Sequence, residues 1–521
     1  MRTQLTPSFL ILRDQSEKVF EYLQEQLHSH LYISISSQRI FKENFLVNPK
    51  EQSYNDDLIR GMNIRVFDGS TMHEWAHPQS DLGVIKGELD QWLETLKSIK
   101  PAKPVYVSPS WTERLAAVSE SEILSQVSEA PETSEWVHFG VPQKKPWPKS
   151  TQEGMDWLKD RYTDFKNETL KLEEKHPARV LDFSLARLDL SFEEHCFIDS
   201  SVRMTQALPR VLCVIAAVKK GERGYHLTGG LGGMETIQLT SEEFHHIFND
   251  LENLVKAEPL PPGRYDLLMH PSVSGVFAHE AFGHSQEGDT WARGRSKAKD
   301  LYESKESVGN SHATILNNPA IYKNAWEDAM AWGSYFFDEE GWLASEQVLV
   351  DQGQLQLPMT DFVSSYRLQI PRTANGKRES WSHGIYTRQT NTYFSEGDKT
   401  FDQLLAQVKN GYYARHPYGG MEDPKGMGIQ VGIGYVEEIV DGQLTGRTFK
   451  GPNGGAIQMT GYVPDYLNQI VDKSKIDAFS QGKDHSKYPW NEIGGCGKYH
   501  KESVHAGCGG PYLLVSNALL S

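Results

Sequence analysis

The chain has 521 residues and a formal net charge of −16, from 53 basic and 69 acidic residues. This negative charge argues against nucleic-acid binding, because nucleic-acid-binding surfaces neutralise phosphates with lysine and arginine. No stretch reaches the roughly 18–20 consecutive apolar residues of a membrane span, and the apolar run 9–12 is too short for a signal-peptide core. We therefore expect a cytoplasmic protein without membrane contact. Its four cysteines are too few for a disulfide framework.

The N-terminal part of the chain combines helix and strand patterns. Apolar residues recur at helical spacing between Val19 and Leu27, and residues 64–67, which precede Asp-Gly, are typical of a strand entering a turn. A proline-rich stretch near 128–150 predicts an exposed connection or a lid. A helix is expected to follow over residues 151–175.

Two strands and a well-marked helix precede the middle of the chain. Residues 180–185 alternate in polarity, and residues 211–218 form a continuous apolar run typical of a buried strand. Thr240 and Glu243 have the spacing of a capping box at the start of the next helix. Prolines after this helix predict a boundary between an N-terminal mixed α/β region, 1–260, and a C-terminal catalytic region, 261–521.

A strand over residues 265–269 leads into the segment with the clearest chemistry, His279 to His284. Two imidazoles can hold a divalent cation, and Glu280 can accept a proton from water. A step of five residues turns a regular helix by about 140°, which would point the two rings apart. A π-helical turn, yielding at Gly283, would bring them together. The alternative is a polar patch on a helix without a metal.

Short alternating runs dominate the rest of the C-terminal region. Residues 345–355 and 429–448 each contain a hairpin signal, Asp-Gln-Gly or Asp-Gly, between apolar runs. Helices and strands do not alternate as in a doubly wound fold. The expected class is therefore α+β.

A second set of candidate ligands lies near the C-terminus. Cys496 stands between glycines and precedes Lys498, and zinc accepts a thiolate beside imidazole. A glycine-rich tail follows, from Val504 to Pro511. In this order, the central segment, C-G-K and the tail resemble the TldD/PmbA metallopeptidases, whose active members carry H-E-A-x-G-H, then E-G-D, C-G-K and a glycine-rich end. The E-G-D block corresponds to residues 285–289, and two further blocks resemble the family in the same order, at residues 375–380 and 388–393.

The resemblance implies a complete metal site. His279, His284 and Cys496 become the metal ligands and Glu280 the general base, with one divalent ion per chain, zinc or alternatively iron. Two positions depart from the family tail, because His505 replaces a proline and Cys508 adds a thiol, and either is an alternative extra ligand. The family fold implies an α/β-type N-terminal region and a curved, mostly antiparallel C-terminal β domain with an embedded metal-binding helix.

The expected reaction is metal-assisted peptide hydrolysis. Zinc lowers the pKa of water from 15.7 to about 7, and Glu280 would pass the released proton to the leaving amine. Arg378, Tyr393 and His505 are candidates, by residue type, for binding substrate or polarising its carbonyl. An open strand edge in the β domain would accept an extended peptide by backbone pairing, which favours unfolded or flexible substrates.

Two other functions compete with this interpretation. The family includes members that lack the metal motif and pair with an active one, so a non-catalytic partner subunit is one alternative, although the complete motif argues against it. A metal-dependent amidase acting on small molecules is the other. The resemblance also implies a dimer, formed either by two copies of this chain or with a family paralogue.

Overall fold

The structure is a computed structural model of the chain. It describes residues 3–97, 99, 106–118, 121–127, 131–175, 181–322, 330–475, 492–498 and 502–521. Within these residues, no helix has both the length and the apolar character needed to cross a bilayer.

A seven-stranded sheet dominates the N-terminal half, in the order β3-β2-β1-β5-β6-β4, with β7 also pairing with β6. All neighbours are antiparallel except β4 and β6. The strands are β1 (Tyr32–Val47), β2 (Gln52–Phe67), β3 (Met72–His77), β4 (Trp136–Gly140), β5 (Phe183–Ile198), β6 (Arg203–Lys219) and β7 (Glu222–Leu231). The pairing of β1 with β2 runs from end to end without a register shift, so the alternate residues of β1 keep to one face throughout.

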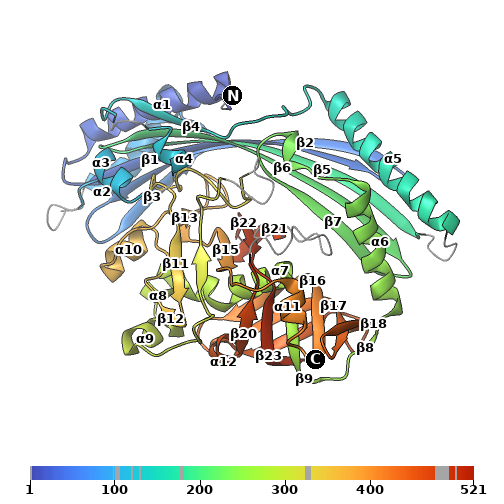
Figure 1. Cartoon of the computed structure of the whole chain (residues 1–521). Helices are drawn as coiled ribbons and strands as arrows, with labels where there is room; N and C mark the ends of the chain where they lie inside the picture. The colour runs from blue at the N-terminus through green and yellow to red at the C-terminus, as the bar shows by residue number, and fades with distance from the viewer. Residues whose placement is uncertain are drawn as a thin grey trace.

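Helices cover one face of this sheet (Figure 1). The helices of this half are α1 (Pro7–Gln26), α2 (Leu82–Lys97), α3 (Trp111–Ala116), α4 (Ser121–Leu124), α5 (Thr151–Lys175) and α6 (Ser241–Lys256). Helices α1 and α2 pack on Ile33 and Ile35 at one end of β1, whereas α5 and α6 pack on Phe45 and Val47 at the other. These four residues are odd-numbered, so the even-numbered residues of β1 face the C-terminal half.

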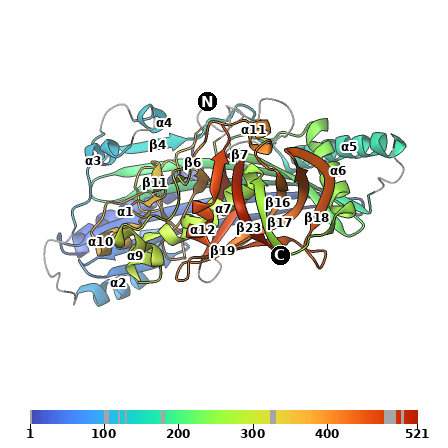
Figure 2. The ribbon, with the colours of Figure 1, turned by 60° about the horizontal axis from the view of Figure 1, so that its bottom comes forward.

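The C-terminal half contains an eight-stranded sheet that closes on itself, because β17 pairs with both β19 and β16 (Figure 2). Its strands are β8 (Glu258–Pro259), β9 (Gly263–Met269), β16 (Asn410–Asp423), β17 (Gly428–Val440), β18 (Gln443–Lys450), β19 (Ile457–Tyr462), β20 (Ile470–Lys473) and β23 (Leu513–Leu520). Most of its pairings are antiparallel, and β16 with β9 and β18 with β8 are the parallel ones. The result is a partial barrel.

A six-stranded sheet lies beside this barrel, in the order β12-β11-β10-β15-β22-β21. Its strands are β10 (Ile315–Asn317), β11 (Gln347–Asp351), β12 (Gln354–Leu355), β15 (Asn391–Phe394), β21 (Glu492–Lys498) and β22 (Glu502–Gly509), and β13 (Gly376–Lys377) pairs separately with β14 (Tyr386–Thr387). The remaining helices are short: α8 (Gly288–Ala292), α9 (Lys297–Ser304), α10 (Phe362–Leu368), α11 (Phe401–Leu405) and α12 (Val463–Asn468).

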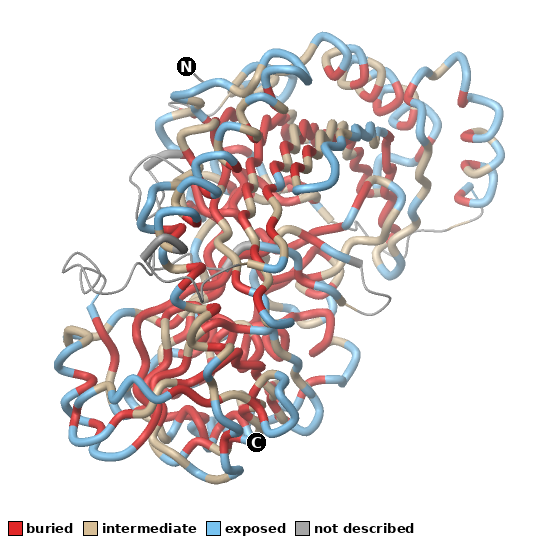
Figure 3. Tube along the Cα trace, turned by 90° about the vertical axis from the view of Figure 1, so that its right-hand side faces the viewer, coloured by how far each residue is buried: buried red, intermediate tan, exposed pale blue. Residues whose placement is uncertain are grey.

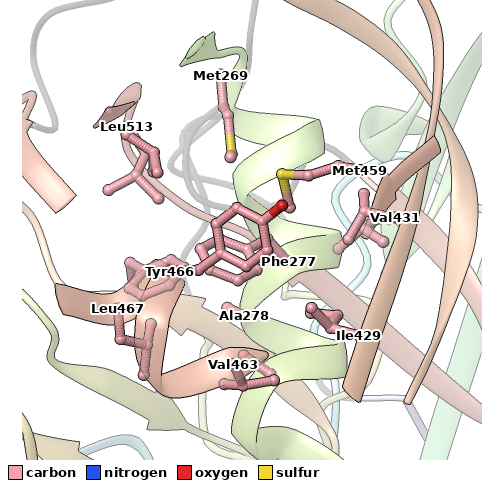
Figure 4. Close-up of a cluster of buried hydrophobic side chains, with 14 of the residues drawn as sticks. Met269, Phe277, Ala278, Ile429, Val431, Met459, Val463, Tyr466, Leu467 and Leu513 are labelled. Atoms are coloured by element: carbon pink, nitrogen blue, oxygen red, sulfur yellow. The ribbon is translucent and has the colours of Figure 1, made fainter. Parts of the chain in front are cut away.

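Helix α7 (Pro271–Ala278) is buried between the barrel and the six-stranded sheet, with β16 on one side and β15 and β22 on the other. All eight of its residues are buried. Phe277 and Ala278 lie among barrel side chains such as Val431 and Met459 (Figure 4). Buried backbone runs through the centre of both halves, and exposed residues line the outside (Figure 3). The start of the candidate site is therefore fixed by core packing.

The expected α+β class is confirmed, as are the helix capped by Thr240 and Glu243 and the hairpins β11–β12 and β17–β18. The proline-rich stretch 128–150 is more ordered than expected, because β4 lies within it and pairs with β6. Residues 128–130 of that stretch and residue 180 lie outside the described residues. The division near residue 260 stays a prediction.

Candidate metal centre

The helix that begins as α7 changes its winding at the motif. Residues His279–Gly283 form a π-helical turn, and His284–Gln286 continue as a 3₁₀ turn. The rings of His279 and His284 consequently lie 5.0 Å apart between centroids, at an angle of 87°. This confirms the π turn predicted from the five-residue spacing.

Gly283 is required at the end of the π turn because the buried side chain of Gln389 occupies the adjacent space. A Cβ atom at this position would lie 2.0 Å from Gln389 Oε1. Gln389 is not free to move away, since its Oε1 accepts a hydrogen bond from Thr392 Oγ1 (2.8 Å) and its Nε2 donates to the carbonyl of His279 (3.3 Å). Gln389 thus links the π turn to β15.

Gly283→Ala is expected to lower the free energy of unfolding by about 1–3 kcal/mol, because the added methyl group overpacks this contact. It should also weaken metal binding, since Gln389 can no longer hold the His279 carbonyl. Gly87→Ala is the matched control: Gly87 lies in α2, where an added Cβ atom would have no neighbour within 4 Å. The control should gain about 0.5–1 kcal/mol from its higher helix propensity. Denaturant unfolding measures both; equal stability of the two variants would refute the packing argument.

Cys496 reaches the two histidines from the opposite side, on β21. Its Sγ lies 3.3 Å from Nε2 of His284. One donor atom from each of His279, His284 and Cys496 lies within 4.8 Å of the others. Residues 212 positions apart in sequence are therefore brought together by the packing of α7 on the β21–β22 hairpin.

The electrostatics of the three residues favour the ligand form of the thiol. Burial alone would raise the pKa of Cys496, but the imidazoles of His284 and His279 lower it well below its usual value. Burial lowers the pKa of His284, and the opposing effects of Cys496 and Glu287 raise it well above its usual value. A thiolate beside two imidazoles is a donor set that divalent zinc prefers.

The spacing of these donors fits a tetrahedral ion. With Zn–S near 2.3 Å and Zn–N near 2.0–2.1 Å, sulfur and nitrogen ligands of one ion lie about 3.5 Å apart. The observed separation of 3.3 Å between Cys496 Sγ and His284 Nε2 is close to this value. Three protein donors leave a fourth position for a reactant, which is the pattern of catalytic rather than structural zinc.

Glu280 lies within the π turn, buried beside this cluster. Its side chain fits against β16 because residue 420 is glycine. A Cβ atom added at this position would lie 2.6 Å from Glu280 Cγ. Glu422, two residues further along β16, forms a second group with Glu280 and His284, with donor atoms within 4.8 Å of one another. Burial raises the pKa of Glu422 to about 7; the His284 charge opposes this increase, and Glu280 adds to it. No sequence signal identified Glu422, because its position depends on how β16 packs.

Glu287 and Lys498 form an ion-pair network beside the ring of His284. In the sequence they stood out only as parts of motifs. Glu287 Oε2 lies 3.4 Å from His284 Nδ1 and 2.7 Å from Lys498 Nζ. Lys498 Nζ also contacts Asp289 Oδ1 (2.6 Å) and donates to the carbonyl of Thr387 (2.9 Å). Burial would raise the pKa of Glu287, but Lys498 and His284 lower it to about 2. An ionised Glu287 favours a proton on Nδ1 of His284 and leaves Nε2 available to a metal.

A cleft of about 150 Å³ opens beside His279 and Glu280. Much of its wall is backbone, because Gly419, Gly494, Gly495 and Gly507 line it. Strand β21 is the last strand of its sheet, and among the described residues no strand pairs with its outer edge. Two of its carbonyls are already used, because Gly494 O accepts a hydrogen bond from Trp332 Nε1 (2.8 Å) and Cys496 O accepts one from Arg388 Nη2. The glycine-lined wall lets a ligand come close to the cluster.

Comparison with known proteins agrees with this geometry. Residues 262–521 match the family model of the PmbA/TldA metallopeptidase C-terminal domain. The chain belongs to the TldD/PmbA family. It is similar to a metalloprotease of Methanothermobacter thermautotrophicus (32% identity over 302 residues, 57% of this chain and 59% of the relative). It is also similar to a TldD homologue of Haemophilus influenzae (31% identity, 50% of this chain and 49% of the relative).

A third relative of this TldD/PmbA chain is a zinc metalloprotease TldD homologue of Saccharolobus solfataricus, with 30% identity over 33% of this chain and 37% of the relative. The matched part thus spans about three fifths or less of these curated relatives. Solved structures share the fold: TldE from Thermococcus kodakarensis aligns with a TM-score of 0.65, 14% identity and 97% and 100% coverage of the two chains. A Thermotoga maritima protein described as a putative modulator of a DNA gyrase aligns with a TM-score of 0.65 and 15% identity. This alignment covers 98% of this chain and 99% of the other.

The three residues predicted to bind substrate lie away from the metal cluster of this TldD/PmbA chain. Arg378 donates to Ser36 Oγ on β1 (2.9 Å). Tyr393 donates its hydroxyl to Glu346 (2.9 Å). His505 Nε2 lies 2.8 Å from Glu193 Oε1 on β5.

The strand register explains the position of His505. Cys496 pairs with Val504 and Gly495 pairs with His505, so the side chains of Cys496 and His505 leave the hairpin on opposite faces. His505 is therefore not an extra metal ligand, and that alternative was wrong. Cys508 lies on the same face as Val504 and lines the cleft, but it is absent from the donor groups formed by the described residues.

Glu287→Gln is expected to reduce metal affinity about 10–100-fold. This is the usual effect of losing the group that hydrogen-bonds to the second ring nitrogen of a metal-binding histidine. The amide keeps the shape but not the charge that holds both His284 and Lys498. Competition with a chromophoric chelator measures the affinity. Glu222→Gln removes the partner of Lys450 far along β7 and should leave the affinity unchanged; equal losses in both variants would contradict a specific role for Glu287.

Proposed function

We propose that this chain is a metal-dependent peptidase that hydrolyses peptide bonds in unfolded or flexible polypeptides. The observation that carries the proposal is the convergence of His279, His284 and Cys496, with Glu280 buried beside them. The family membership supports the metallopeptidase class, and a relative described as a zinc metalloprotease supports zinc over iron.

His279, His284 and Cys496 would hold the ion. When bound, zinc supplies Lewis-acid chemistry: it lowers the pKa of water to about 7 and polarises the scissile carbonyl. Glu280 accepts the proton of the attacking water and transfers it to the leaving amine, so that one carboxylate acts first as base and then as acid. Glu287 keeps the His284 ring oriented throughout.

The substrate class follows from the cleft. An extended peptide would lie along the backbone of the cleft wall, and the glycines of the wall leave room for its side chains. Such binding selects an extended backbone rather than a particular sequence. A folded protein cannot present one, so denatured protein should be cut faster than its native form.

Removal of the metal is expected to abolish hydrolysis of casein by the purified chain, and about one equivalent of Zn²⁺ should restore it. Metal content is followed by mass spectrometry on the same samples. Hydrolysis that persists after complete chelation would refute the proposal. A parallel panel of peptides and small amides separates peptidase from amidase activity, and a metal-free, inactive chain under metal-replete conditions would favour the partner-subunit alternative.

A further inference from the structure

A second cavity, of about 200 Å³, lies between the large N-terminal sheet and the β21–β22 hairpin. Figure 1 shows this hairpin directly below the sheet. We call it the hairpin cavity, and its floor contains Gln206, Arg210 and Phe337. Lys42, Glu379 and Ser503 line it with half-buried or exposed side chains, so it is open to solvent.

The hairpin cavity is distinct from the metal cleft. Ser503 and His505 line it, and by strand register they lie on the face of β22 opposite to the face shared with Cys496. None of the three proposed metal ligands lines it. A molecule bound there would touch the hairpin without reaching the metal.

Several buried donors in this cavity lack full hydrogen bonding within the described part of the chain. His195 and Arg378 are both more than nine-tenths buried, and neither His195 Nε2 nor Arg378 Nε has a hydrogen-bond partner among the described residues. His195 Nε2 lies 3.7 Å from Glu193 Oε2, an ion pair that is too long for a hydrogen bond. Arg378 Nε lies 3.6 Å from Glu339, an ion pair that is too long for a hydrogen bond. Lys377 Nζ donates to the carbonyl of His505 (2.6 Å), which uses one of its three protons.

The carboxylates around the cavity are already engaged. Glu193 contacts Arg210 and His505 and lies 3.7 Å from His195 Nε2, while Glu339 lies 3.3 Å from His195 Nδ1. Asp338 accepts hydrogen bonds from the backbone of Trp342 and Gly376. Burial and then the Arg210 charge lower the pKa of Lys377 to about 7. Buried donors without acceptors are costly, so an anion with several acceptor atoms would satisfy this site.

We propose that the hairpin cavity binds a small carboxylate, held by Lys377, Arg378 and His195. A cavity of about 150 Å³ holds a molecule the size of benzene, so about 200 Å³ accommodates a carboxylate with a few further heavy atoms, such as one amino-acid residue. The carboxylate can come from a free small molecule or from the C-terminus of a peptide.

The test is calorimetric titration of the metal-loaded protein with N-acetylglycine at constant ionic strength, with the uncharged N-acetylglycinamide as the matched probe. We expect saturable binding of the acid and none of the amide. A tripeptide with a free C-terminus and its amidated form then distinguish the two sources. Equal binding of acid and amide, or no binding of the acid because water alone fills the cavity, would overturn the proposal.

Variants locate the bound carboxylate. Lys377→Met and Arg378→Gln should each weaken binding about tenfold or more, the effect of losing one charge-assisted hydrogen bond. Arg447→Gln, an exposed charge on β18, should leave binding unchanged. Cys496→Ala should also retain it. Binding that is lost in Cys496→Ala but survives in Lys377→Met would assign the carboxylate to the metal and refute the hairpin cavity. The comparison of acid with amide in the unaltered chain stands even if a variant fails to fold.

Discussion

Glu280→Gln is expected to lower kcat for peptide hydrolysis by about 10²–10⁴-fold while the metal content stays at the level of the unaltered chain. Glutamine has nearly the same shape, so the contact with Gly420 and the π turn should persist. It cannot accept a proton from water, and it is not one of the three donors assigned to the metal. Metal analysis and casein hydrolysis on the same preparation test both parts.

Glu422 provides the critical comparison, because it lies close enough to Glu280 and His284 to compete for the role of base. Glu422→Gln should reduce kcat less than Glu280→Gln. If Glu422→Gln were the more damaging change, the general base would be misassigned. Glu438→Gln, at a half-buried position on β17 that pairs with Arg447, controls for the loss of one negative charge and should have no effect.

The spacing of the two histidines was sufficient to predict the local structure. A spacing of five positions between the histidines, with a glycine before the second, left a π turn as the arrangement that brings their rings together, and the structure has that turn. This prediction succeeded because helix geometry is local and is fixed by a few backbone angles.

The surroundings of the site could not be predicted in this way. Residue type favoured His505 as a substrate contact, but strand register turns its side chain away from Cys496, and register is set by pairing between distant segments. Glu422 was missed for a similar reason, because β16 meets the π turn only after the barrel closes. The roles of Lys498 and Glu287 could be assigned only from the structure, which shows the short distance between Lys498 Nζ and the Glu287 carboxylate.

The N-terminal half shows the same limit on a larger scale. Its helix α6 was predicted from a capping box and an apolar stripe, which are local signals. The seven-stranded sheet was predicted only in part. The strands expected at 64–67 and 211–218 lie in β2 and β6, but the order of the sheet depends on distant pairing, and the proline-rich segment conceals β4. The even-numbered residues of β1 that line the hairpin cavity, Gln38, Ile40 and Lys42, have no distinctive pattern in the sequence.

Cys496→Ala is expected to remove the metal and, with it, essentially all peptidase activity. The change deletes the one anionic donor and leaves two imidazoles, which together bind zinc far more weakly than a set of three. The loss of affinity should therefore exceed the 10–100-fold expected for Glu287→Gln. Metal content by mass spectrometry should fall from about one ion per chain to near zero.

Cys508→Ala is the matched control for this change. Cys508 is a buried thiol on the neighbouring strand β22, it lines the cleft beside His279, and it is absent from the donor group. Its removal should leave metal content and activity close to those of the unaltered chain. If the metal were lost with Cys508 and retained without Cys496, the third ligand would lie on β22, and the assignment of Cys496 would be refuted.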